Sequence, residues 1–422
     1  MKHLTLATLM VIVAGGCESL GPEATRPSPG LPLFSLAPGT ETPVTTDPAW
    51  QQSPAISGDR VVWEDFRNIS ISNLDLFLFD FSTGTETRLT TEPESQRAPA
   101  ISGDRAVWTD FRNGGSNSEI YLLQISSGTE TRITNNIFTQ QEPDIDGDRI
   151  VWEDGRSGSS DLFMFDLATG TESRVPAGTS RKVNPAISGN RIVWMDQRNG
   201  NFDIYEFDLA TGTERQITSN VLDEIDPAIS GTRIVWTDQR NGNPDIYLFD
   251  LATGTETQIT SDPASQIRPD IDGDRVVWMD SRNGNPDIYM LDLTAGAESQ
   301  ITSDPSTQSV PVISGKRIAW MDFRNGNADI YAFKLGTTIA EVVRRVNECL
   351  ASGDISDPGF AQKLKSLLAG AQQDLDRGDI VGAKRGLRNV INQLNAQSGK
   401  KISVACAHDL RVLTEEVLAG LP

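Results

Sequence analysis

The sequence is poor in histidine and in positive charge, and each shortage excludes a class of function. Its only two histidines are His3 and His408, so the long region between them cannot hold a metal ion through imidazole. Lys and Arg number 37 against 58 Asp and Glu, which gives a formal net charge of −21. Because such a surface repels the phosphate backbone, we expect no nucleic-acid partner. The chain also lacks a G-x-S-x-G motif, the turn that presents the nucleophile of α/β-hydrolases.

Long apolar runs are scarce as well, and the run near the start covers only residues 4–13, too few to span a bilayer as a helix. It stands within "MKHLTLATLMVIVAGGCESL", where a basic residue precedes it and small residues follow, as is typical of an export signal. "AGGC" resembles a bacterial lipobox, which makes Cys17 the lipidated first residue of the mature protein. We therefore expect a signal peptide over 1–17 and a Pro/Gly-rich linker over 18–32. Cleaved secretion without a lipid is the alternative.

What the sequence does contain is a repeat centred on tryptophan, with successive copies 45, 44, 42, 42, 42 and 42 residues apart. The seven equivalent residues are Trp63, Trp108, Trp152, Trp194, Trp236, Trp278 and Trp320. A fixed period in the forties indicates a propeller or a solenoid, in which no copy buries its apolar face alone.

Each copy contains four short runs of alternating apolar and polar residues. In the fourth copy these runs span 185–188, 191–196, 203–209 and 213–218, and "SGNR", "QRNGN" and "ATGT" separate them. Gly and Asn tolerate the positive φ that tight hairpins need. The pattern predicts one four-stranded antiparallel blade per copy, and hence a mainly β protein with a seven-bladed propeller over 33–337.

The two ends of the repeated region complement each other. The last copy stops at "DIYAFKLGTT" and lacks a "GTETQIT" strand, whereas the segment before the first tryptophan, "LFSLAPGTETPVTTDP", contains one. Pairing of residues 40–45 with residues 328–335 removes the open sheet edge that an unclosed array would expose. We expect the N-terminal strand to close the propeller.

The repeat carries a resemblance to a known family. "PAISGDRVVW", "RNGNPDIYLFDL" and "TGTETQIT" resemble the blade motifs of TolB-like, PD40-type propellers, and the resemblance covers about residues 33–335. Such blades occur in envelope proteins, peptidase propellers and some sugar lyases, so the resemblance implies a fold and leaves the activity open.

The pattern changes to helical after residue 337. "TIAEVVRRVNECLASG", "SDPGFAQKLKSLLAGAQQDLDRG", "DIVGAKRGLRNVINQLNAQSG" and "SVACAHDLRVLTEEVLAG" space apolar residues at three and four and end near Gly, which predicts a small four-helix bundle over 338–422. The segments "GDISDPGFAQKLKSLLAGAQQDLDRGD" and "VINQLNAQSGKKI" resemble the FIMAH-type helical module, which implies accessory or adhesive work.

Two cysteines fall in this bundle, Cys349 in its first helix and Cys406 in its last. Both follow an export signal, and disulfides persist in exported proteins. The first and last helices of such a bundle are commonly neighbours. We expect a Cys349–Cys406 disulfide, with two buried free thiols or an intermolecular bridge as alternatives.

Every copy also repeats Asp-x-Arg shortly after the tryptophan. An active site needs a unique constellation, so seven equivalents indicate a structural ring of charge-assisted hydrogen bonds within or between blades. The pairs are Asp65/Arg67, Asp110/Arg112, Asp154/Arg156, Asp196/Arg198, Asp238/Arg240, Asp280/Arg282 and Asp322/Arg324.

Sequence differences between the copies concentrate on one predicted face. The "SGDR" and "ATGTE" turns hardly vary, whereas the nine-residue links between blades all differ, and the loops at 68–74 and 113–118 are longer than their counterparts. Interfaces are enriched in aromatic and Arg contacts. The expected binding residues, taken as exposed, are Trp50, Arg97, Phe138, Arg181, Lys182 and Arg268. Free drift of surface loops is the alternative.

These observations favour a non-enzymatic binding or scaffold protein of the bacterial cell envelope, lipid-anchored, periplasmic or extracellular. We expect a monomer that binds an envelope protein or a glycan through the differing face and touches the membrane only through its lipid. We expect no cofactor and no metal, because the "NGN-x-D" and "DIDGDR" segments are interpreted as plain turns. A glycan-active lyase or hydrolase that uses carboxylates on the propeller is the alternative.

Overall fold

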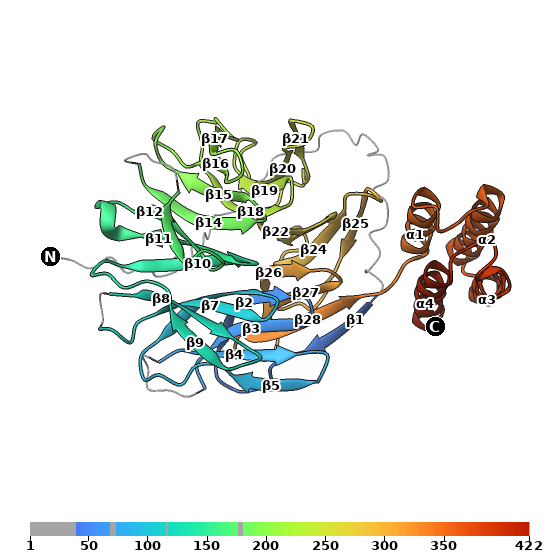
Figure 1. Ribbon diagram of the computed structural model, residues 1–422, viewed down its shortest axis with the longest axis horizontal. Coiled ribbons are helices and arrows are strands. Elements are labelled where there is room, and N and C mark those ends of the chain that lie inside the picture. The colour runs from blue at the N-terminus through green and yellow to red at the C-terminus, as the bar shows by residue number, and fades with distance from the viewer. Residues whose placement is uncertain (1–38, 68–72, 115–116, 176–179, 422) are drawn as a thin grey trace, which may run out of the picture. The chain divides into compact units, whose positions relative to one another are not determined.

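The computed structural model describes residues 39–67, 73–114, 117–175 and 180–421. The expected signal peptide, Cys17 and the linker lie outside these described residues. Seven four-stranded antiparallel sheets surround a common axis, and four helices follow them in the chain (Figure 1). The predicted seven-bladed propeller with a C-terminal helical bundle is therefore confirmed.

The innermost strand of each blade contacts the innermost strands of its two neighbours, so seven of them line the axis. They are β2 (Gln51–Ser57), β6 (Gln96–Ser102), β10 (Gln140–Asp146), β14 (Lys182–Ser188), β18 (Glu224–Ser230), β22 (Gln266–Asp272) and β26 (Gln308–Ser314).

The second strands are buried on both sides, because the adjacent blades cover both faces of each sheet. They are β3 (Arg60–Asp65), β7 (Arg105–Asp110), β11 (Arg149–Asp154), β15 (Arg191–Asp196), β19 (Arg233–Asp238), β23 (Arg275–Asp280) and β27 (Arg317–Asp322). All seven repeat tryptophans lie on them and are fully buried. Each tryptophan stacks on an aromatic ring of the third strand, at 6.0–6.5 Å between centroids.

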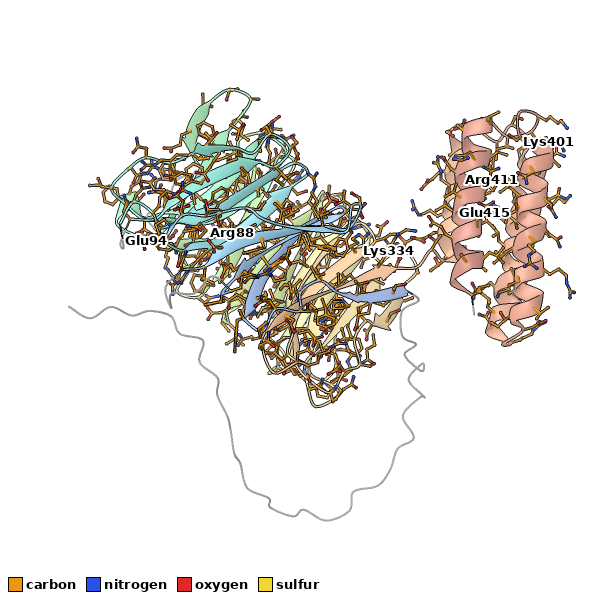
Figure 2. All side chains as sticks on the ribbon, turned by 90° about the horizontal axis from the view of Figure 1, so that it is seen from below. Arg88, Glu94, Lys334, Lys401, Arg411 and Glu415 are labelled. Carbon is orange, nitrogen blue, oxygen red and sulfur yellow. A yellow bond between two sulfur atoms is a disulfide. The ribbon has the colours of Figure 1, made fainter. Side chains whose placement is uncertain are left out.

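The two outer strands complete each blade, and the fourth is short and exposed. The third strands are β4 (Asp75–Asp80), β8 (Glu119–Gln124), β12 (Asp161–Asp166), β16 (Asp203–Asp208), β20 (Asp245–Asp250), β24 (Asp287–Asp292) and β28 (Asp329–Leu335). The fourth strands are β5 (Thr85–Arg88), β9 (Thr129–Arg132), β13 (Thr171–Arg174), β17 (Thr213–Gln216), β21 (Thr255–Gln258) and β25 (Ala297–Gln300). Arg88, at the end of β5, reaches back to Asp75 at 2.9 Å (Figure 2).

The seventh blade takes its fourth strand from the other end of the described chain. Strand β1 (Gly39–Pro43) pairs antiparallel with β28, with Gly39 opposite Leu335 and Pro43 opposite Tyr331. The predicted N-terminal closure is confirmed. Beyond β1 the backbone amides of Val44 and Thr45 both donate to the Ile330 carbonyl oxygen, which ends the ladder.

The face that carries the "SGDR" and "ATGTE" turns, called the uniform face below, is held by contacts from blade to blade. The Gly amide of each "SGDR"-type turn donates to the side chain that ends the innermost strand of the preceding blade, at 2.5–3.1 Å. Gly58 donating to Ser314 Oγ at 2.9 Å closes this ring of seven bonds. Such a turn cannot change alone, which explains why these segments are alike in every copy.

The innermost strands begin earlier than the sequence predicts. In the fourth blade the strand starts at Lys182 rather than at residue 185, because Asn184 forms a β-bulge with a φ of 53°. Proline follows this residue in the chain, and its missing N–H prevents regular pairing there. The seven bulge residues are Ser53, Ala98, Glu142, Asn184, Asp226, Arg268 and Val310.

The C-terminal bundle consists of α1 (Ile339–Ala351), α2 (Pro358–Asp376), α3 (Ile380–Gln397) and α4 (Val404–Gly420). Polar caps begin all four helices; Thr338 and Ser403, for example, accept backbone amides of α1 and α4. Cys349 on α1 and Cys406 on α4 form a disulfide within the buried core. None of the helices in the described residues is long and apolar enough to cross a membrane.

Candidate functional site

The face opposite the uniform face, called the variable face below, consists of the links from each fourth strand to the next blade and the loops between second and third strands. It carries every exposed large apolar side chain of the described propeller residues. Ile137 and Val221 are 84% and 87% exposed, and Trp50 is 50% exposed. Phe138 and Leu222 lie beside the first two. Exposed apolar side chains confined to one face are typical of a contact surface.

Five of the six residues expected to bind a partner are exposed; three of them lie in links of this face, whereas Arg97 and Arg268 lie on the innermost strands β6 and β22. Trp50 meets the Phe323 ring edge-on at 6.0 Å between centroids. The Arg97 guanidinium lies 5.7 Å from the Phe111 centroid, and the Arg181 guanidinium lies 5.4 Å from that of Phe202. Both guanidinium–ring distances are within the range of a cation–π interaction. The five residues are Trp50, Arg97, Phe138, Arg181 and Arg268.

The expectation that Lys182 is exposed is wrong. Its side chain is 0% exposed, and its Nζ lies 2.8 Å from Asp161 Oδ1. Lys182 is the first residue of β14 rather than part of a surface link, and the first residue of every innermost strand is buried. The sequence prediction begins this strand at residue 185, so it misses the strand residues that precede the bulge at Asn184.

Three residues of the variable face escaped the sequence prediction: Ile137, Val221 and Leu222. They are aliphatic, and aliphatic residues between strands look like strand residues when only the sequence is read. The sequence nevertheless contained an indication of them, because the links "TNNIFTQQE" and "TSNVLDEID" have apolar residues where other links have the polar "TSDP".

A central channel runs inside the innermost strands and contains a cavity of about 380 Å³. Prolines and small apolar side chains form much of its wall. Three acids, Glu142, Asp144 and Asp270, project into it. The bulge residues lie on the strands that line this channel, which places charged Asp226 and Arg268 in the same ring as Glu142.

The channel acids differ from free carboxyls in protonation. Burial raises the pKa of Asp144 to about 6, against the hydrogen bonds that its oxygens accept from the Ile187 and Ile145 amides. Burial, with the charge of Asp144 adding, raises the pKa of Asp270 to about 7. The surrounding protein raises the pKa of Glu142 to about 7, and the charges of nearby glutamates contribute. Carboxyls whose pKa is shifted in this way are candidates for functional groups.

Asp144 and Asp270 were interpreted as parts of plain hairpin turns. The turns themselves are ordinary, with Gly147 at a φ of 58°. The interpretation missed that the first Asp of "DIDGDR" points toward the axis, where four other copies have Ala and one has Val. That substitution of a charged for an apolar residue was the available signal.

The residue after the repeat tryptophan supports the channel wall in several blades. Glu64 Oε1 accepts the Ala98 amide at 2.7 Å, and Glu153 Oε1 accepts the Asn184 amide at 2.9 Å. Both amides belong to bulge residues of the next blade. The bulge leaves this backbone amide without a partner in its own sheet, and a side chain of the preceding blade accepts its hydrogen bond instead.

The Asp-x-Arg pairs make the same contacts in all seven blades, and all of these contacts lie within a blade. Each Asp accepts a hydrogen bond from the tryptophan Nε1 at 2.8–3.2 Å. The Arg of each pair binds a Glu of the fourth strand. Its guanidinium also lies 3.9–4.4 Å from the centroid of an aromatic ring. In the last blade the Glu is Glu41 of β1.

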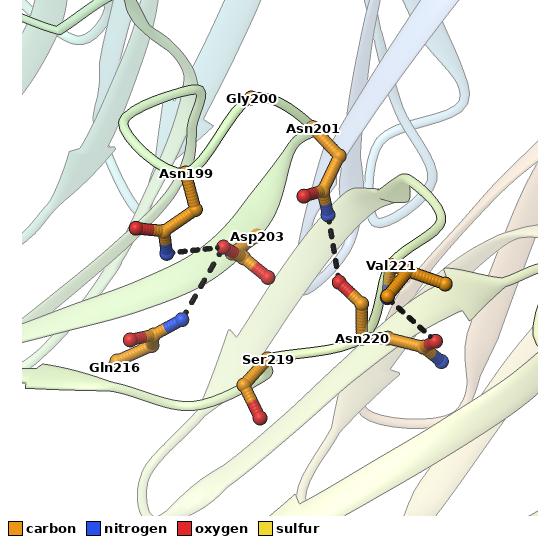
Figure 3. A pocket seen from close by; sticks show the side chains of 8 residues that line it. All are labelled: Asn199, Gly200, Asn201, Asp203, Gln216, Ser219, Asn220 and Val221. Carbon is orange, nitrogen blue, oxygen red and sulfur yellow. Dashed lines mark hydrogen bonds between the residues drawn. The ribbon is translucent and has the colours of Figure 1, made fainter.

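In the "NGN-x-D" loops the first Asn closes the turn on the loop's own Asp, as interpreted from the sequence, whereas the second Asn bonds to the link that leads to the next blade. Asn199 Nδ2 donates to Asp203 Oδ2 at 2.7 Å, and Asn201 Nδ2 donates to the Asn220 carbonyl oxygen at 3.0 Å (Figure 3). Among the described residues, no group of three or more His, Cys, Asp or Glu side chains is arranged to hold a metal ion.

Comparison with known families matches both parts of the chain. The model of the TolB beta propeller domain matches residues 40–230 and 225–359, and that of the FIMAH domain matches residues 339–419. No curated protein matches the chain.

Several solved structures share the propeller fold. An oligogalacturonate lyase in complex with manganese aligns with a TM-score of 0.52 and 13% identity, over 71% of this chain and 98% of the lyase. The β-propeller domain of the Trilobed protease from Pyrococcus furiosus aligns with a TM-score of 0.54 and 12% identity, over 68% and 95%. A puromycin-hydrolyzing peptidase of Mycobacterium tuberculosis gives 0.54 and 12%, over 65% of this chain and 49% of the peptidase. Identities this low speak for the fold alone.

Proposed function

Because the chain belongs to the TolB beta propeller family, we propose that it is a non-enzymatic binding protein of the bacterial cell envelope. In this proposal a monomer engages a protein or glycan partner through the variable face. The FIMAH domain supplies an accessory or adhesive contact.

The observation that carries this proposal is the one-sided distribution of exposed apolar side chains. Trp50, Ile137/Phe138 and Val221/Leu222 occupy three separate links of the variable face, around the mouth of an acidic channel. A partner that covers this face buries all three apolar sites at once, and such central apolar contacts dominate binding energy. The uniform face, whose turns are bonded to one another, lacks such side chains in its described residues.

We expect a face variant to lose its partner without losing its fold. The variant combines Trp50→Ala, Phe138→Ala and Val221→Ser, and its melting temperature should stay near that of the wild type because all three side chains are exposed. Capture from envelope extracts, followed by binding measurements with the purified partner, should show a loss of at least about 100-fold in affinity.

The matched control changes the uniform face instead, with Ala168→Ser, Ala210→Ser and Ala252→Ser, which are exposed positions in its turns. This control should bind like the wild type. Equal binding by all three proteins would mean that the variable face is not the contact surface.

The cellular location in this proposal rests on the sequence at 1–17. A lipid on Cys17 with the 18–32 segment as a tether keeps the propeller at a membrane surface. The acidic balance of the chain suits a partner with basic or neutral groups rather than nucleic acid.

We expect Cys17→Ala to move the protein from the membrane fraction to the soluble fraction of the cell. The reason is that two or more acyl chains make membrane attachment lasting, and the substitution removes their attachment atom. Fractionation followed by immunoblotting measures the change, with Ala168→Ser, an exposed substitution of the uniform face, as the control that leaves position 17 intact. An unchanged distribution would support cleaved secretion without a lipid.

A second candidate, a glycan-active enzyme, is favoured by the channel acids. A carboxyl with a pKa near 7, such as Glu142 or Asp270, suits a general acid at neutral pH. The fold shared with an oligogalacturonate lyase adds a reason to assay acidic oligosaccharides. Product release by the wild type that Glu142→Gln or Asp270→Asn abolishes would favour this candidate over the binding protein.

A further inference from the structure

The first residue of every innermost strand occupies one repeated, buried position at a blade boundary. In five blades it is glutamine, in the fourth it is Lys182 and in the fifth it is Glu224; all are 0% exposed. The register confirms the equivalence, because Lys182 pairs with Asp196 and Glu224 pairs with Asp238. The five glutamines are Gln51, Gln96, Gln140, Gln266 and Gln308.

Gln51 shows what surrounds this position where the glutamine oxygen has a partner; in the described residues the Oε1 atoms of Gln96, Gln140, Gln266 and Gln308 are buried without one. Gln51 donates its amide to the Ala49 carbonyl oxygen at 2.7 Å, and its Oε1 accepts the Thr45 hydroxyl at 3.0 Å. The same hydroxyl lies 3.4 Å from Asp329 Oδ1, on the third strand of the preceding blade. One small polar space therefore contains the first residue of the strand, the threonine of the link and the carboxylate of the preceding blade.

In the fourth blade a positive charge fills this space. Lys182 Nζ contacts Asp161 Oδ1 at 2.8 Å, and Asp161 is the counterpart of Asp329. Lys182 keeps the pKa of Asp161 below its usual value although burial acts in the opposite direction. The boundary can therefore hold a cation beside the carboxylate.

In the fifth blade the same space contains two carboxylates. The Thr218 hydroxyl interacts with the Glu224 carboxylate, but within the described part of the chain no group donates to either Glu224 oxygen at ordinary hydrogen-bond geometry, and buried Asp203 Oδ1 also lacks a donor. Figure 3 shows that the amides of Asn199 and Gln216 both point to the other oxygen of Asp203. Buried carboxylate oxygens without partners are costly, which indicates a missing positive group.

The remaining charged groups near Glu224 are already engaged. Asp238 accepts Trp236 Nε1 at 3.0 Å and the guanidinium of Arg240, and Arg240 also binds Glu256. Burial raises the pKa of Glu224 to about 8; a hydrogen bond from the Thr218 hydroxyl opposes this shift, and the charges of Asp238 and Asp203 add to it. No lysine reaches this boundary among the contacts of the described residues.

An open cavity of about 590 Å³ leads to this boundary from the variable face. Asp203 lines it, together with Asn199, Gln216, Ser219 and Asn220. These side chains are polar, so a hydrated ion can approach the buried oxygen of Asp203 through them.

We propose that Asp203 and Glu224, with the Thr218 hydroxyl, bind a calcium ion at the boundary of the fourth and fifth blades. The ion takes the place that the Lys182 ammonium holds one blade earlier. Oxygen-only ligands select hard cations, and two carboxylates balance a divalent charge. Two protein carboxylates completed by water give an affinity on the order of 10⁻⁴–10⁻³ M, as in other extracellular calcium sites.

The test is calorimetric titration of the full chain with calcium chloride at pH 8, after removal of bound ions with a chelator. We expect one site in the wild type, and 10 mM calcium should raise the melting temperature by about 3 °C. Glu224→Gln and Glu224→Lys should both abolish the heat of calcium binding. Each introduces the side chain that stands at the same position of another blade boundary.

Glu94→Gln is the matched control, because it removes one exposed carboxylate from another link of the variable face (Figure 2). It should bind calcium like the wild type. Equal calcium binding by wild type and Glu224→Gln would overturn the proposal, since the ion would lie elsewhere. Absence of any heat would overturn it too.

Discussion

A protein that begins at Asp47 should melt roughly 10 °C below one that begins at Leu33, because the seventh blade loses its outer strand. The shortened protein lacks β1, which pairs with β28 over five residues. It also lacks buried Val44, worth about 2 kcal/mol, and several hydrogen bonds worth about 1 kcal/mol each. The exposed edge of β28 adds a tendency to aggregate. Differential scanning calorimetry of the two proteins measures the difference.

Point substitutions in the longer protein test the same strand without truncation. Val44→Ala together with Thr45→Ala removes a buried side chain and the hydroxyl that accepts the Ile330 amide at 2.8 Å. The melting temperature of this variant should lie between those of the proteins that begin at Leu33 and at Asp47. Glu41→Gln, which weakens only the partly exposed pair with Arg324, serves as the control and should change the melting temperature little. Equal melting temperatures for all four proteins would mean that β1 does not close the propeller.

Removal of the Cys349–Cys406 disulfide should destabilise the helical bundle by about 4 kcal/mol. The bridge closes a loop of 57 residues between α1 and α4, and opening it restores conformational freedom to the unfolded chain. The bundle is small, so this loss is a large share of its stability. We expect the Cys349→Ser, Cys406→Ser variant to lose helical circular dichroism at a lower temperature or urea concentration, while the β signal of the propeller is unchanged.

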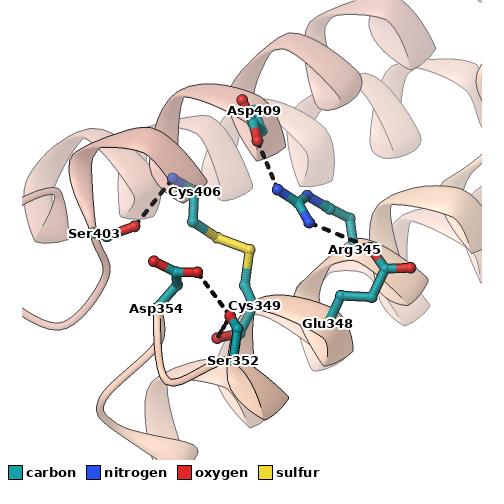
Figure 4. Close-up of a disulfide and its surroundings, with 8 residues drawn as sticks. All are labelled: Arg345, Glu348, Cys349, Ser352, Asp354, Ser403, Cys406 and Asp409. Atoms are coloured by element: carbon teal, nitrogen blue, oxygen red, sulfur yellow. Dashed lines mark hydrogen bonds and ion pairs between the residues drawn. A yellow bond between two sulfur atoms is a disulfide. The ribbon is translucent and has the colours of Figure 1, made fainter.

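A second contact between the same helices provides the control. Arg345 on α1 lies 2.7 Å from Asp409 on α4, close to the disulfide (Figure 4). Both side chains are partly exposed, so Arg345→Ala should cost about 1 kcal/mol or less. Mass spectrometry of the unreduced wild type should find no free thiol at either cysteine. Two free thiols, or equal stability of all variants, would remove the bridge from this account.

The sequence by itself determined the fold. The tryptophan period counts the blades, the four alternating runs give their strands, and the displaced "GTETP" segment shows how the last blade is completed. These features are local, because alternation and turn chemistry act over a few residues. The four helices and their caps are local in the same sense, as Thr338 with Glu341 illustrates.

The tertiary structure alone decided which side chains face water, the channel or a blade boundary. Lys182 and Arg181 are adjacent in sequence, yet one is buried against Asp161 and the other is exposed beside Phe202. The bulge at Asn184 changes the register between them and the rest of the strand; Pro185 favours a bulge there, but which side chains it buries depends on the packing of the blades. Asp144 and Asp270 lie 126 residues apart and share a channel only because the blades form a ring, whereas Glu224 and Asp203 share a boundary because consecutive blades pack together. Charge pairs of this kind depend on distance in space, which a repeat fixes only once its copies are packed against one another.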